Sequence, residues 1–148
     1  MNAEAGPTPS DAELSAICDE AHRHDLPVTA HAQEGRARPR GRRRRLAHAP
    51  WTERLSDGAR EAAAARMRFV STLRIHGSGP PLETAATTCA GSGRQGGDLS
   101  YGTDLGNAGT PAGIDAREAQ LWTQAGWTNQ EVLAAMIRAP LDGMRRPT

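Results

Sequence analysis

Helical segments that lead into short apolar runs recur along this chain, and this alternation restricts its fold more than any other feature. Ser10 followed by Glu13 forms a capping box, and apolar residues recur behind it at helical spacing. These signals predict a helix over residues 11–24. The apolar run over residues 26–30 then has the composition of a buried strand, which ends at His31.

The same order of helix and then strand returns in the middle of the chain. An Ala-rich segment over residues 56–68 predicts a helix, and residues 69–73 follow as a β-prone run. Residues 101–104 end a further short strand. Strands that alternate with helices are typical of an α/β fold in which helices cover parallel strands.

Two more helices are expected near residues 116–125 and 129–138. Each is opened by a capping pair, Asp115 with Glu118 and Thr128 with Glu131. Gly126 is placed to end the first of them in a left-handed conformation, and Pro140 should stop the second.

Two stretches lack any apolar periodicity. Residues 34–45, EGRARPRGRRRR, contain seven arginines and are predicted to be a loop or disordered. Residues 77–99 are rich in Gly, Ser, Thr and Pro and are predicted to be a long loop. Both resemble insertions between the regular elements.

Size and composition limit the fold and the partners. With 148 residues, 37% hydrophobic and 3% aromatic, residues 1–148 can form one domain with a modest aliphatic core. A complete (β/α)8 barrel of the TIM type takes roughly 250 residues. The net charge of +1 predicts no general attraction to nucleic acid or to anionic membranes.

The sequence carries no signal for export or for a membrane span, since it has neither a signal peptide pattern nor an 18-residue apolar stretch. Cys18 and Cys89 form no C-x-x-C pair, so no zinc ribbon or redox motif is indicated. We expect a cytoplasmic protein without a membrane partner.

Three polar residues lie at or near the ends of apolar runs: His31, His48 and Asp104. The C-terminal ends of parallel strands carry the active sites of α/β folds, and imidazole with carboxylate is an ordinary ligand set for zinc. Each residue also has a purely structural interpretation. A single histidine is more often just hydrogen-bonded, and an aspartate before a Gly-rich loop can be a turn residue.

The segments around these residues, LPVTAHAQ, LAHAPWTE and YGTDLGNAGTPAGIDARE, resemble successive parts of the amidohydrolase superfamily, in particular its imidazolonepropionase-like and prolidase-like members. The resemblance covers residues 6–33, 46–76 and 100–143 and corresponds to the C-terminal half of the family's barrel, about its last four βα units.

The resemblance implies a metal-dependent hydrolase that acts on carbon–nitrogen bonds of amides or cyclic amides. His31, His48 and Asp104 match positions that hold one or two divalent ions, zinc above all, and Asp104 matches the catalytic proton acceptor. His76 matches a position that contacts the small-molecule substrate, although a solvated loop residue would have the same sequence pattern.

The chain also departs from the family. No H-x-H pair of strand type precedes His31, because His22 and His24 lie on the helix predicted above, where we expect them to be surface residues without a role. The chain has no lysine, so a carboxylated lysine cannot bridge two metals. We therefore expect an incomplete metal site and no competent turnover by this chain alone.

A half-barrel would leave sheet edges open, so self-association is also expected. The two irregular stretches led us to a hypothesis of frameshifts or decay in the gene. An alternative function is a non-enzymatic degenerate scaffold with an Arg-rich segment that binds nucleic acid or another partner. That segment has no aromatic residues for base stacking, so we do not expect specific nucleic-acid binding.

Overall fold

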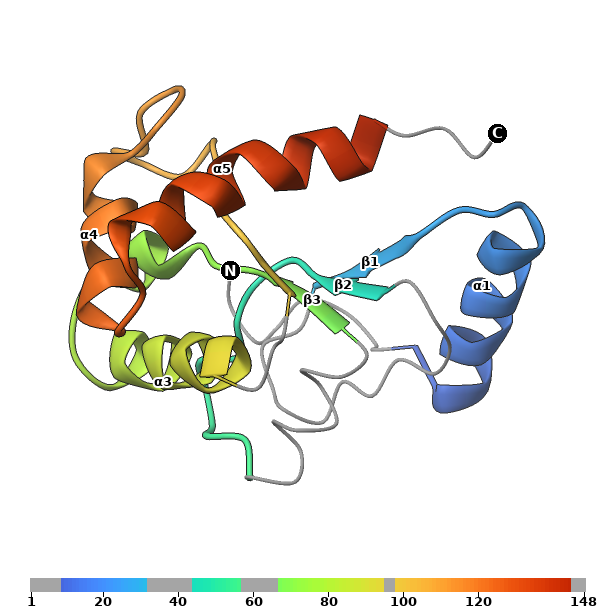
Figure 1. The fold of residues 1–148 in the computed structure, drawn as a ribbon. Helices are drawn as coiled ribbons and strands as arrows, with labels where there is room; N and C mark the ends of the chain where they lie inside the picture. Colours follow the sequence, from blue (N-terminus) through green and yellow to red (C-terminus); the bar gives the residue numbers. More distant parts are fainter. Residues whose placement is uncertain (1–8, 32–43, 57–66, 95–97, 145–148) are drawn as a thin grey trace.

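One parallel sheet of four strands, in the order β1-β2-β3-β4, organises the computed structural model (Figure 1). The structure describes residues 9–31, 44–56, 67–94 and 98–144. In chain order the elements are α1 (Asp11–Arg23), β1 (Val28–Ala30), β2 (Arg44–Leu46), β3 (Met67–Val70), the 3-10 helix η1 (Leu73–His76), α3 (Pro80–Arg94), β4 (Asp98–Ser100), α4 (Ala116–Gln124) and α5 (Asn129–Met144). The α/β class with parallel strands is confirmed.

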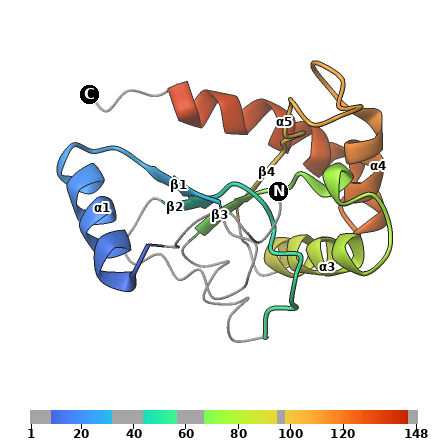
Figure 2. The same cartoon turned by 180° about the vertical axis from the view of Figure 1, so that it is seen from behind.

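The register of the strands places one apolar row on the helix-covered face of the sheet. Ala30, Leu46, Phe69 and Leu99 are successive partners across the four strands. Leu46, Phe69 and Leu99 are buried in a core that includes Trp122. As Figures 1 and 2 show, α3 and α4 lie at the opposite end of the molecule from α1. The core therefore gathers around β3 and β4.

The helix starts follow their capping signals. Ser10 and Glu13 form the predicted box, with Glu13 N–H donating to the Ser10 hydroxyl at 3.3 Å and Ser10 N–H donating to the Glu13 carboxylate at 2.7 Å. Thr128 and Glu131 do the same for α5. Asp115 caps α4, but its partner in the predicted pair turns into the core instead of bonding back.

Of the two predicted helix ends, one agrees with the structure and the other does not. Gly126 has the expected positive φ, 98°, just after α4. The prediction that Pro140 stops the last helix was wrong, because α5 continues to Met144. A proline removes one N–H donor, and a helix whose earlier turns are anchored in the core, here by Val132 and Ala135, can continue past that loss.

The predicted loop over residues 77–99 was also wrong, since it contains α3 and β4. The composition suggested a loop, but Ala85, Thr88 and Cys89 bury one face of α3 against the core. Thr88 donates its hydroxyl to the Thr84 carbonyl at 3.1 Å, which satisfies that polar group inside the helix. Burial of this face outweighs the weak local helix preference.

The strands β2 and β3 also begin at other residues than the sequence predicted, because contacts with neighbouring strands override local composition. The Arg-rich loop predicted over residues 34–45 lies mostly outside the described residues, but Arg44 and Arg45 belong to β2 and not to a loop. Backbone pairing with β1 and β3 holds them there, whatever their side chains. The helix predicted over 56–68 lies largely outside the described residues, and β3 already begins at Met67.

A buried carboxylate joins α4 to the end of β3. Glu118 is fully buried and accepts hydrogen bonds from the Ser71 hydroxyl at 2.5 Å, the Arg74 backbone N–H at 2.7 Å and the Trp122 indole at 3.0 Å. Hydrogen bonds from these three donors offset the desolvation cost of burying the carboxylate. The segment that follows β3 is thereby fixed relative to α4.

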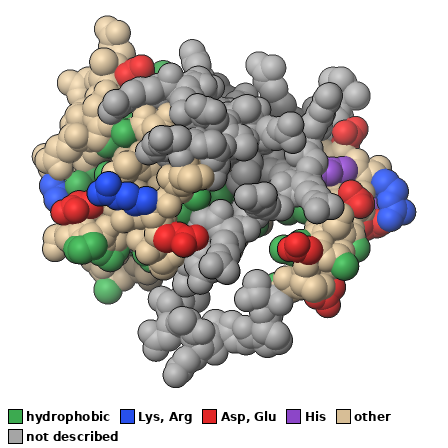
Figure 3. All heavy atoms as spheres, turned by 90° about the horizontal axis from the view of Figure 1, so that it is seen from below, with side chains coloured by type: hydrophobic (Ala, Val, Ile, Leu, Met, Phe, Trp, Pro, Cys, Tyr) green, Lys and Arg blue, Asp and Glu red, His purple; other side chains and the backbone are tan. Residues whose placement is uncertain are grey.

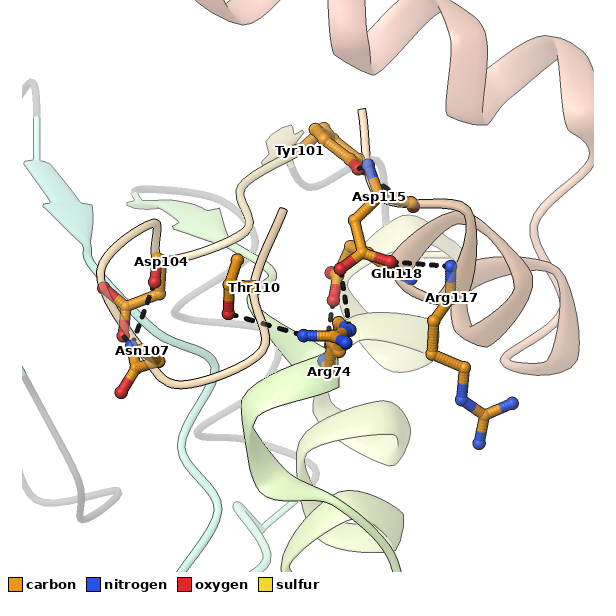
Figure 4. A network of polar contacts seen from close by, with 8 residues as sticks. All are labelled: Arg74, Tyr101, Asp104, Asn107, Thr110, Asp115, Arg117 and Glu118. Atoms are coloured by element: carbon orange, nitrogen blue, oxygen red, sulfur yellow. Dashed lines mark hydrogen bonds and ion pairs between the residues drawn. The ribbon is translucent and has the colours of Figure 1, made fainter. Parts of the chain in front are cut away.

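A second set of contacts ties the loop after β4 to the same place (Figure 4). The Arg74 guanidinium pairs with the Asp115 carboxylate, with 2.7 Å between Nε and Oδ2. The Tyr101 hydroxyl donates to the Asp115 carbonyl at 3.1 Å and accepts from its N–H at 2.7 Å. Both ends of the loop 102–114 are therefore anchored.

Replacing Glu118 by Ala should lower the free energy of unfolding by about 3 kcal/mol, because it leaves several buried donors without an acceptor. Urea denaturation followed by circular dichroism measures the loss. Glu131→Ala is the matched control, since Glu131 also accepts hydrogen bonds but is exposed, and its effect should be much smaller. Equal losses in both variants would show that the buried network does not stabilise the fold.

Candidate functional site

The polar residues singled out from the sequence lie at one edge of the sheet. His31 directly follows β1, His48 follows β2 by two residues, and Asp104 follows β4 by four. His76 ends the 3-10 helix behind β3. Because all four strands are parallel, these positions share the C-terminal edge, where α/β folds place their sites.

The histidine rings form one cluster around Trp51. The ring centroids of His31 and His48 are 4.5 Å apart, and Trp51 lies edge-on to both, at 6.0 Å and 5.5 Å. Trp51 also packs against His76, with 4.8 Å between the ring centroids. The indole therefore connects imidazoles that come from three different strand ends.

Burial differs among the imidazoles. His48 is 6% exposed, His76 is partly buried and His31 is exposed. His48 Nδ1 lies 2.8 Å from the hydroxyl oxygen of Thr72. The Nε2 atom of His76 is buried and has no hydrogen-bond partner within the described parts of the chain. A buried polar atom without a partner is unusual, so this nitrogen is available to a ligand.

Asp104 occupies a tight turn. Its φ is 54°, in the left-handed region, which aspartate adopts more readily than most residues other than glycine. The Asn107 side-chain amide donates to the Asp104 carboxylate at 2.6 Å and to its carbonyl at 2.9 Å (Figure 4). Asp104 is thus a turn residue, as the structural interpretation of the sequence suggested. Its carboxylate also acts on the histidine cluster.

Burial favours the neutral form of His48 and of His76. Burial lowers the pKa of His48, and the neighbouring His31 lowers it further, while the Asp104 carboxylate raises it. Burial lowers the pKa of His76 to about 4, helped by His48 and opposed by Asp104. Neutral imidazoles keep a lone pair, which a metal ligand or a proton acceptor needs.

The described side chains do not form a closed ligand set. Among residues 9–31, 44–56, 67–94 and 98–144, no three His, Cys, Asp or Glu side chains are arranged so that they could hold a metal ion together. Sequence reasoning named His31, His48, His76 and Asp104, which all follow strand ends, and their role as a site stays a prediction. It missed Trp51 and Thr72, although Trp51 lies only three residues after His48.

Two other histidines considered from the sequence lie on α1 and at its C-terminal end. His22 and His24 belong to α1 and its C-terminal cap, and His24 is 3.1 Å from Glu20. Residues 34–43 of the Arg-rich segment lie outside the described residues. Figure 3 shows described acidic and basic side chains together at both sides of the face seen from below. No helix of the described chain is long and apolar enough to cross a membrane.

Comparisons with family models, with curated proteins and with solved structures find no match for this chain.

The low pKa of His76 predicts a pH dependence of stability. In the folded state His76 protonates near pH 4, whereas in the unfolded state it protonates near its ordinary value of 6.5. Between these values the unfolded state binds more protons, so the contribution to stability is present above about pH 6.5 and is lost as the pH falls toward 4.

The measurement is the urea midpoint at several pH values for the wild type and for His76→Phe, which keeps a ring against Trp51 but cannot titrate. The variant should lose less stability between pH 7 and pH 4.5 than the wild type. Parallel curves for the two proteins would contradict the assigned pKa.

Proposed function

We propose that this edge of the sheet is the metal site of a hydrolase that acts on carbon–nitrogen bonds of amides or cyclic amides. The observation that carries the proposal is the gathering of His31, His48 and His76 around Trp51, with the Asp104 carboxylate acting electrostatically on His48 and His76. The sequential parallel order of the strands supports a relationship to the barrel of the amidohydrolase superfamily.

The residue types fit a zinc ion. Two imidazoles that share a tetrahedral zinc, with bonds of about 2.1 Å, bring their ring centres to about 5 Å from each other. His31 and His48 are at 4.5 Å. The neutral form of His48, which its burial favours, fits the same use. We assign His31, His48 and Asp104 as ligands. Their side chains would have to move closer together to share one ion, because in this structure they do not form a ligand set.

A bound divalent ion would supply Lewis acidity, polarising the substrate oxygen and lowering the pKa of water to about 7. Asp104 would accept the proton of the attacking water and pass it to the leaving amine. His76, as a neutral imidazole, would hydrogen-bond the substrate. Trp51 would form an apolar wall that keeps bulk water from this side of the site.

Removal of a ligand should weaken zinc binding by more than the roughly 10- to 100-fold that loss of an outer-shell partner causes. We expect this for His31→Ala and for His48→Ala, measured by competition with a chromophoric chelator. His22→Ala is the control, because His22 lies on α1 and should leave the affinity unchanged. Equal zinc affinity in all these proteins would show that the ligands are assigned wrongly.

Turnover should be low, because the sequence has no lysine and no strand-type H-x-H pair to complete the site. Amide, lactam and dipeptide substrates with added zinc or manganese provide the assay. Any hydrolysis should depend on the metal and fall to background in Asp104→Asn, which cannot accept the proton. Metal-dependent turnover that survives Asp104→Asn would refute the role of Asp104.

A further inference from the structure

The side chain of Thr72 reaches the buried histidine of the cluster from the neighbouring strand end. Its hydroxyl oxygen lies 2.8 Å from His48 Nδ1, and both residues are buried, at 2% and 6% exposure. We propose that Thr72 is a positioning residue that holds His48 with its proton on Nδ1 and its Nε2 lone pair free for a ligand. The proposal deepens the metal site proposed above and rests on it for its functional consequence.

The backbone of Thr72 points to the same role. Thr72 has φ 49° and ψ 36°, a left-handed conformation that is a genuine outlier for a β-branched residue. Such strain costs about 1–3 kcal/mol and persists only where the surroundings impose it, commonly at functional sites. Nothing about the cap of η1 requires it, because the Thr72 side chain makes no capping hydrogen bond there.

The segment after β4 imposes this conformation through contacts with Thr72 and with the residues just before it. Its N–H donates to the Gly102 carbonyl at 3.2 Å, and the preceding Ser71 N–H donates to the Ser100 carbonyl at 3.0 Å. Gly102 comes so close that a Cβ added to it would lie 2.3 Å from Val70 Cγ1. The loop after β4 therefore presses against the end of β3 and fixes the direction of the Thr72 side chain.

The hydrogen bond with Thr72 engages one of the two ring nitrogens of His48. Nδ1 is occupied by Thr72, so only Nε2 remains for a metal or for a proton. When Nδ1–H donates to the hydroxyl oxygen, Nε2 carries the lone pair and the ring orientation is fixed. Partners of this kind raise the basicity of a ligand imidazole, and their loss typically costs about 10- to 100-fold in metal affinity.

The experiment compares Thr72→Val, which keeps the shape and removes the hydroxyl, with Thr72→Ser, which keeps the hydroxyl. Thr88→Val is the matched control, because Thr88 is also 2% exposed but donates its hydroxyl to the Thr84 carbonyl within α3. The first readout is the 15N chemical shifts of the His48 imidazole without metal, which distinguish a protonated nitrogen from one with a lone pair. The second is zinc affinity.

We expect the Nδ1–H tautomer in the wild type, in Thr72→Ser and in Thr88→Val, and a mixture of tautomers in Thr72→Val. Zinc affinity should fall about 10- to 100-fold in Thr72→Val alone. Thermal melts show whether each variant is folded. If Thr72→Val does not fold, the tautomer of His48 in the wild type still tests the proposal.

An Nε2–H tautomer in the wild type overturns the proposal, and so does Thr72→Val with unchanged tautomer and affinity. If the wild type shows the Nδ1–H tautomer and Thr72→Val loses it, but no protein binds zinc, then the positioning role stands and the proposed metal site fails.

Discussion

The buried carboxylate of Glu118 is the contact on which the candidate site depends. It holds the Ser71 hydroxyl and the Arg74 N–H, and Thr72 lies between these two residues. A buried charge is tolerated only when donors surround it, so α4 and the segment after β3 must keep one relative position. The Glu118 contacts therefore fix the segment that contains Thr72 and leads into η1, on which His76 lies.

Burial gives the site its chemical character. The imidazoles of His48 and His76 lose water and lie near other imidazoles, and both effects favour the neutral form. The Asp104 carboxylate opposes this shift without reversing it. The edge of the sheet therefore combines imidazole lone pairs with the carboxylate of Asp104. Electrostatic interactions in such a buried environment are stronger than in water.

Local signals in the sequence were sufficient for part of this structure. Capping pairs act within one turn of a helix, so the starts of α1 and α5 could be read directly. Short apolar runs that end in a polar residue identified the neighbourhood of His31, His48 and Asp104, because parallel strands bring their C-terminal ends to one edge.

Other features depend on contacts between distant segments. A Gly/Ser/Thr-rich stretch becomes α3 because Ala85 and Cys89 find a core to pack against. Glu118 carries a capping signal, yet it turns inward because Ser71, Arg74 and Trp122 offer it donors. The sequence by itself determined where helices begin and where polar residues follow strands, since those interactions are local. Only the tertiary structure decided which side chains meet, because burial and hydrogen bonding between remote segments outweigh local preference.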